Sequence, residues 1–113
     1  MPLKRMVLEI GMGTDIRGRD STKAAVRALK DALWRNALSI AQALDLEPKD
    51  MHVKVLIGVP RPETVDKAAV LAALPYGGGE IEVHDGGLFV PRPGSQDGTT
   101  IAHAAAIVML DVS

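Results

Sequence analysis

The feature that most constrains the fold is an apolar, strand-like run that is followed by a glycine-containing segment and then by a long helical pattern. Residues 3–10 are predicted to form a strand, and residues 22–45 a helix. Apolar residues in the helical stretch recur at steps of three and four, which aligns them into one stripe: Val26, Leu29, Leu33, Ala37, Ile40 and Leu44. The stripe predicts a helix packed against a sheet, with Asp20 or Ser21 as its N-cap.

The remaining patterns predict further strands and a second helix. In the strand predicted for 51–59, four β-branched residues share one face, and His52, Lys54 and Leu56 share the other. The other predicted elements, in chain order, are a helix at 63–74, an alternating strand at 80–84, a hairpin turn at 85–87, a short return strand at 88–90, a mobile loop at 91–99 and a last strand at 101–112.

The order is therefore β-α-β-α-β-β, with the short strand at 88–90 as an extra element, which predicts an α+β fold in a single domain spanning residues 1–113. Two helices can cover one face of such a sheet. The other face would combine apolar residues with some of Glu9, His52, Lys54 and His103. So much half-apolar surface is unusual on a monomer, so we expect self-association through this face or along the sheet edges.

Composition excludes several classes of function. Thirteen basic residues against fourteen acidic ones give a formal net charge of −1, and the chain has one Phe, one Tyr and one Trp. Neither the charge nor the aromatic content suits nucleic-acid binding. Without cysteine there is no disulfide or thiolate site. No apolar run reaches the roughly 20 residues that cross a bilayer, and no signal peptide is evident, so we expect a soluble cytoplasmic protein without membrane partners.

The segment 11–23 is predicted to bind a small anionic or carbonyl-bearing ligand. Gly11 and Gly13 would let the backbone approach the ligand, and the following helix would point free N–H groups at it. Four cations crowd the same place: Arg17, Arg19, Lys23 and Arg27. The alternative is a flexible connection with solvated charges. The segment matches neither a phosphate-binding P-loop nor a dinucleotide fingerprint.

Other ionisable residues are candidates for chemistry or for ordinary structural roles. Asp15 is a candidate general base, although a charge-paired scaffold role is the simpler reading. Glu9 and Lys54 are expected to pair across neighbouring strands, and they would become acid–base candidates if assembly buried them. His103 could line an intersubunit pocket. Arg61 could bind a carboxylate through both of its terminal nitrogens.

Metal ligation is not expected. The residues considered were His52, His84 and His103, with Glu82 and Asp85 as helpers. Their spacing matches no known metal motif, and His52 and His103 are read instead as strand residues with a hydrogen-bond partner. No cofactor is predicted.

Five segments resemble the Lin0512 family, short bacterial proteins of unassigned function. They are IGMGTD at 10–15, DSTKAAVRALKDA at 20–32, IGVPRP at 57–62, LPYG at 74–77 and DGGL at 85–88. The resemblance spans nearly the whole chain and implies no reaction.

A fainter resemblance connects residues 26–32 and 51–55 to one repeat of the ring-opening amidohydrolases, cyanuric acid hydrolase and barbiturase. Those enzymes resemble three fused copies of a trimeric unit that also underlies chorismate mutases and YjgF-like deaminases, with sites between units. This resemblance implies a chorismate-mutase-like or YjgF-like fold. It does not carry over the lysine–serine pair of the amidohydrolases, because His84, Asp85 and Gly86 stand near the expected serine.

Three functions stay open. The first is a homo-oligomeric enzyme, with a trimer favoured, that acts as a hydrolase or lyase on a small cyclic or carbonyl compound at intersubunit sites. There the cations of segment 11–23 would stabilise developing charge. The second is a non-catalytic small-anion-binding or regulatory module. The third is a purely structural oligomer.

Overall fold

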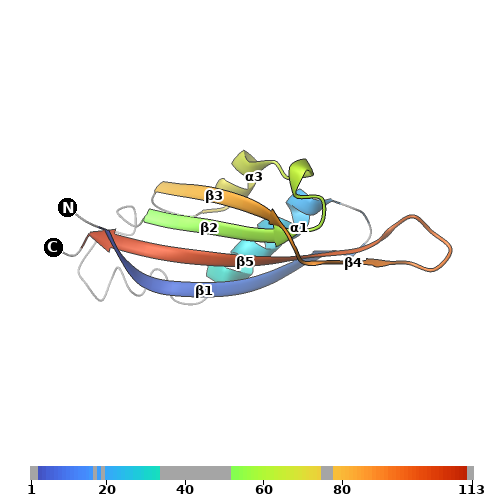
Figure 1. The fold of residues 1–113 in the computed structure, drawn as a ribbon, viewed down its shortest axis with the longest axis horizontal. Coiled ribbons are helices and arrows are strands. Elements are labelled where there is room, and N and C mark those ends of the chain that lie inside the picture. The colour runs from blue at the N-terminus through green and yellow to red at the C-terminus, as the bar shows by residue number, and fades with distance from the viewer. Residues whose placement is uncertain (1–2, 17, 19, 34–51, 75–77, 112–113) are drawn as a thin grey trace.

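The chain forms a mixed sheet with helices on one of its faces, in a computed structural model that describes residues 3–16, 18, 20–33, 52–74 and 78–111 (Figure 1). The strands are β1 (Leu3–Asp15), β2 (His52–Val59), β3 (Gly78–Asp85), β4 (Leu88–Pro91) and β5 (Gly98–Asp111). The helices are α1 (Ser21–Leu33), the 3₁₀ turn η2 (Pro62–Thr64) and α3 (Lys67–Leu71). Element order and class agree with the expected α+β fold. None of the described helices is long and apolar enough to cross a membrane.

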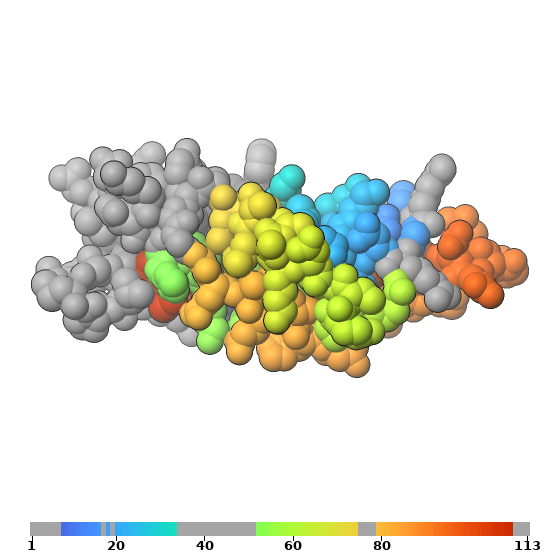
Figure 2. Space-filling view, turned by 90° about the horizontal axis from the view of Figure 1, so that it is seen from above, coloured from blue at the N-terminus to red at the C-terminus, as the bar shows by residue number. Residues whose placement is uncertain are grey.

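The long strand β5 organises the sheet. The spatial order is β1-β5-β2-β3, with β4 paired to the first residues of β5. β5 runs antiparallel to β1, β2 and β4, whereas β2 and β3 are parallel. The parallel pair is joined by η2 and α3, and Figure 2 shows this connection between α1 and β3.

Glycine and alanine form the floor on which α1 packs. Gly11 and Gly13 of β1 pair with Ala104 and Ala102 of β5. A Cβ at Gly11 would lie 2.5 Å from the Ala28 carbonyl oxygen, and a Cβ at Gly13 would lie 2.5 Å from that of Ala24. Only a residue without a side chain leaves room for this approach of helix backbone to strand.

This packing corrects the predicted start of the fold. Gly11 and Gly13 do not end the first strand, which continues to Asp15. The helical stripe was also misplaced: Leu29 is fully buried as predicted, but Val26 and Leu33 are only partly buried. The buried positions of α1 are mainly small ones: Ser21, Ala24, Ala25, Ala28, Leu29 and Ala32. Close approach of the backbones favours small residues over bulky ones here. The predicted helical residues 34–45 lie outside the described residues.

Larger β-branched side chains fill the core beside α1. Val53, Val55, Ile57 and Val59 are at most 2 % exposed and share the helix side of β2, as the alternation predicted. Asp20 caps α1 through the bond from the Lys23 amide to its Oδ1, 3.0 Å long.

The hairpin predicted at 85–87 is wrong. β3 and β4 do not pair with each other; instead Gly86 and Gly87 carry the chain across the end of β2, and β4 takes the place beside β5 that β2 occupies further along β5. Gly87 has a φ of +63°, and a Cβ there would overlap the Ile101 carbonyl oxygen. The residues predicted as a loop at 91–99 instead form the end of β4, a turn closed by the Arg92 amide on the Asp97 carbonyl at 2.8 Å, and the start of β5.

Candidate functional site

The strand-to-helix connection holds only part of the predicted ligand-binding set in the described structure. Arg17 and Arg19 lie outside the described residues. Lys23 is exposed on the first turn of α1. Asp15 is 5 % exposed and accepts a hydrogen bond from the Asp20 amide at 3.2 Å. That bond ties the connection to the end of β1, which fits the scaffold reading of Asp15. The ligand-binding role of this segment stays a prediction.

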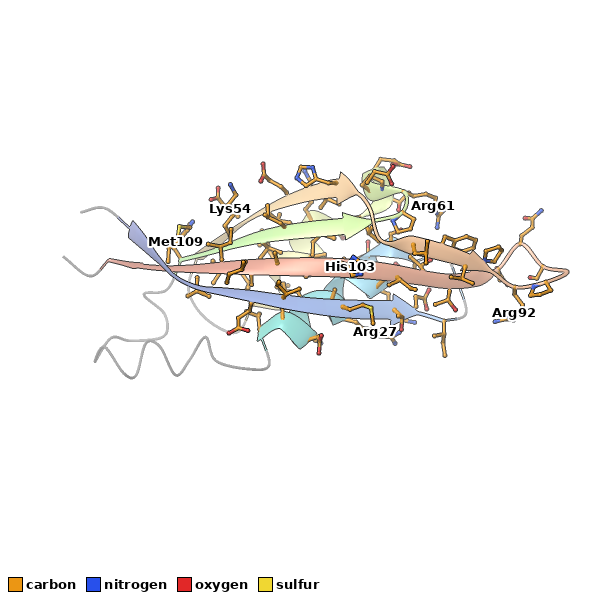
Figure 3. The ribbon with its side chains drawn as sticks, turned by 60° about the horizontal axis from the view of Figure 1, so that its bottom comes forward. Arg27, Lys54, Arg61, Arg92, His103 and Met109 are labelled. Atoms are coloured by element: carbon orange, nitrogen blue, oxygen red, sulfur yellow. The ribbon has the colours of Figure 1, made fainter. Side chains whose placement is uncertain are left out.

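Arg27 faces the outer edge of β1 rather than the connection (Figure 3). Its Nη1 donates to the Thr14 carbonyl oxygen at 2.7 Å. One helical turn later, Asp31 accepts the Met12 amide at 3.0 Å. Since β1 is an edge strand, these two side chains satisfy backbone groups that would otherwise be open to a further strand.

Arg61 follows β2 in a left-handed conformation, with φ 52° and ψ 59°. Its carbonyl oxygen accepts both the amide and the hydroxyl of Thr64, at 3.0 Å and 2.7 Å. These bonds fix the η2 turn. A carboxylate-binding role for the Arg61 side chain stays a prediction.

The expected pairing of Glu9 with Lys54 is wrong. β5 separates the two strands, and Glu9 pairs with Ala106 on the helix side of the sheet. Lys54 pairs in register with Ile107 on the opposite side, and its Nζ lies 3.5 Å from Glu82. The prediction assumed that neighbouring segments in sequence pair in space, whereas β5 inserts between β1 and β2.

The face of the sheet opposite the helices, here called the open face, carries the most distinctive arrangement. Gly58 of β2 pairs with His103 of β5 on one side and with His84 of β3 on the other. The two histidines therefore stand on one row across three strands, two strand spacings apart, or about 10 Å between Cα atoms. Gly58 contributes no side chain between them, and Figure 3 shows His103 at the centre of this face.

A depression of about 280 Å³ lies along this row, and we call it the slot. Its lining is almost entirely apolar and comes from these residues: Ile10, Leu56, Ile57, Gly58, His84, His103, Ala104 and Ala105. A cavity of roughly 150 Å³ is enough to hold benzene. The slot therefore has room for a small ring-sized molecule.

Sequence reasoning singled out His103 as a residue that could line an intersubunit pocket, but it did not place Gly58 and His84 beside it. The signal was present, because a glycine inside an otherwise β-branched strand often marks a close approach of a ligand or another backbone. Register across β5 was needed to place the two histidines beside it.

The two imidazoles are the side chains of the slot that could form hydrogen bonds to a ligand or transfer a proton. An imidazole can donate to a carbonyl or carboxylate and can move a proton near neutral pH. Within the described residues, no group of three histidine, aspartate or glutamate side chains is placed to hold a metal ion. His52, the third histidine, lies 3.7 Å from Glu80 and away from the slot.

Comparison with known proteins gives a family and one similar solved structure. The model of the Lin0512 family, described as conserved hypothetical proteins, matches residues 5–108. A crystal structure of an FtsZ-like protein of unknown function from Nostoc punctiforme is similar, with a TM-score of 0.85 and 36 % sequence identity over 98 % of each chain. No curated protein matches the chain.

Proposed function

The chain belongs to the Lin0512 family, and we propose that it binds a small, flat molecule in the slot between His84 and His103. The observation that carries the proposal is the row His103–Gly58–His84, where a missing side chain separates two imidazoles. A glycine at this position leaves the sheet backbone accessible, and side chains on both sides form walls.

The lining selects the chemistry of the ligand. Gly58 and Ala105 offer a flat apolar floor, and Ile10 and Leu56 add apolar walls. A ring can bury its faces there, gaining about 25 cal/mol for each Å² of apolar surface removed from water. The imidazoles supply the polar groups, so the ligand should carry a carbonyl or carboxylate at its rim. A cyclic carbonyl compound, the substrate class suggested by the ring-opening amidohydrolases, meets this description.

The same groups make acid–base chemistry the reaction type to test. Either imidazole could transfer a proton to or from a carbonyl compound in the slot. Asp15 and Glu9 lie on the helix side of the sheet, so the proposed catalytic groups are His84 and His103. The proposal includes a chorismate-mutase-like relationship, which the β-α-β-α-β-β order supports when the short strand β4 is counted as an extra element. It also includes a cytoplasmic location.

Calorimetric titration with benzoate and with barbiturate tests the proposal, since both probes are flat rings with carboxylate or carbonyl oxygens. We expect saturable binding of at least one probe. We expect about a tenfold loss of affinity in His103→Gln and in His84→Gln, the cost of one hydrogen bond. His52→Gln is the matched control, because that imidazole is on the open face but outside the slot.

Two results would overturn the proposal. One is the absence of binding of either probe to the folded protein. The other is binding that all three glutamine variants retain equally. Following the barbiturate absorbance over time with the same samples shows whether binding leads to turnover.

A further inference from the structure

Large apolar side chains gather on the open face. Those exposed by more than a third are Leu8, Ile10, Met12, Ile16, Leu88 and Val90. All except Ile16 pair in register with β5 residues of the open face: Ile107, Ala105, His103, Ile101 and Thr99. The residues between these partners, such as Ala104 and Ala106, are buried under α1. The exposed apolar surface is therefore one-sided rather than scattered.

This surface is also uncharged across most of its width. Among the open-face residues within 8–14 of β1, 88–91 of β4 and 99–109 of β5, none is Asp, Glu, Lys or Arg. Charges begin at β2 and β3, where Lys54 lies 3.5 Å from Glu82 and His52 lies 3.7 Å from Glu80. Two identical faces could therefore meet without strong repulsion. A nucleic acid or an anionic membrane would need cations that this surface lacks.

The β4–β5 hairpin extends the same surface beyond the body of the sheet (Figure 1). Leu88 and Val90 are 56 % and 47 % exposed on its open-face side. A two-stranded hairpin is only marginally stable in water by itself. Its connection to the body includes the Arg92 Nη2 bond to the Ile16 carbonyl at 3.5 Å. Covering Leu88 and Val90 would stabilise the hairpin.

At Met12 and Thr14, the outer edge of β1 is blocked against the addition of a further strand. Arg27 and Asp31 occupy the Thr14 carbonyl and the Met12 amide. A partner that extended the sheet at these residues would have to displace both side chains. The face itself is free of this obstacle, so contact through the face is favoured over contact through this edge.

We infer that a second copy of this chain packs on the open face, across β1 and β5 and along the β4–β5 hairpin. The molecule measures 56 Å along its longest axis and 22 and 18 Å across it. At about 3.3 Å per residue and about 4.8 Å between strands, β1, β5 and β4 present roughly 500 Å² in flat projection. The relief of the side chains adds to this area, which brings it close to about 600 Å² per partner, the lower end of specific interfaces. The second copy would also roof the slot, and only this last point rests on the proposed function.

Analytical ultracentrifugation over a range of concentrations tests the inference. The wild-type protein is expected to sediment as a multiple of the 12.0 kDa chain. Leu8→Lys and Leu88→Lys place a charge on the face at residues already 43 % and 56 % exposed, so both should fold and sediment as monomers. Ala69→Lys places the same side chain at an exposed position of α3 and should remain assembled.

The outcomes separate the two proposals. A monomeric wild type overturns the inference, and so does an assembly that survives both face substitutions while circular dichroism shows native folding. A dimer or a trimer that dissociates in both variants but not in Ala69→Lys supports it. Assembly of this kind without binding of benzoate or barbiturate supports the interface and contradicts the slot as a ligand site.

Discussion

The two faces of the sheet use small residues for different purposes. Under α1, Gly11 and Gly13 are covered by helix backbone, and most of the buried positions of α1 are alanine. On the open face, Gly58 is flanked by His84 and His103 and lies at the floor of a slot. The comparison teaches that a glycine in a strand indicates that another group can approach the backbone closely. Only the tertiary structure tells whether a helix covers the glycine or whether the space above it is open.

The distances from each glycine to its neighbours show how the two faces differ in free space. A Cβ at Gly13 would lie 2.5 Å from the Ala24 carbonyl oxygen, closer than real Cβ contacts allow. A Cβ at Gly58 would lie 3.7 Å from the Gly86 Cα, an ordinary van der Waals contact. The helix-covered face is therefore filled, whereas the open face has room for an additional group.

The largest effect is expected in the core of the helix-covered face. Leu29→Ala should lower the free energy of unfolding by about 2–5 kcal/mol, because Leu29 is fully buried and its removal leaves a cavity. Leu33→Ala, at a partly buried position, should cost clearly less. Urea titration of both variants measures the difference. Equal losses would mean that α1 is rotated relative to its described position.

Overpacking the same face should have the next largest effect. Gly13→Ala is expected to destabilise the protein by about 3 kcal/mol, because the helix must move away to admit the methyl group. Thermal unfolding followed by circular dichroism measures this change. A stability equal to that of the wild type would show that α1 does not pack closely on β1.

A smaller loss of stability is expected at the outer edge of β1. Asp31→Ala removes the acceptor of the Met12 amide, which should cost about 1 kcal/mol, less the gain in helix propensity from alanine. Faster hydrogen exchange at the Met12 amide is the specific readout. Lys30→Ala, at the neighbouring exposed position, should leave that exchange rate unchanged.

The smallest effect is expected from the ion pair on the open face. Lys54→Met should change the stability of the monomer by about 0.5 kcal/mol or less, because both partners are substantially solvated. The difference should shrink further in high salt. Denaturant titrations at two salt concentrations measure it. A loss of several kcal/mol in the monomeric Leu8→Lys background would place Lys54 in a buried network instead.

Local patterns were enough to predict much of the fold. The alternation in β2 correctly divided Val53, Val55, Ile57 and Val59 from His52, Lys54 and Leu56. Of the two residues predicted as the cap of α1, Asp20 and Ser21, the structure shows Asp20 in that role. The expectation of one covered and one open face is confirmed. These features depend on residues close in sequence, where periodicity and capping chemistry act directly.

Features that depend on register or tertiary packing were not predictable in this way. Gly11 and Gly13 resemble a loop when α1 is not yet in place above them. The sequence Asp85-Gly86-Gly87 resembles a hairpin turn, but the parallel pairing of β2 with β3 excludes a hairpin there. The slot depends on β5 lying between β1 and β2, which no local pattern specifies.

Substitution of Gly58 by alanine, measured for both stability and binding, tests most directly whether the open face is the functional one. The added methyl group meets only ordinary contacts but occupies the floor of the slot. We predict a free energy of unfolding near that of the wild type and a clear loss of benzoate or barbiturate binding. Undiminished binding in a normally folded Gly58→Ala protein would contradict the account.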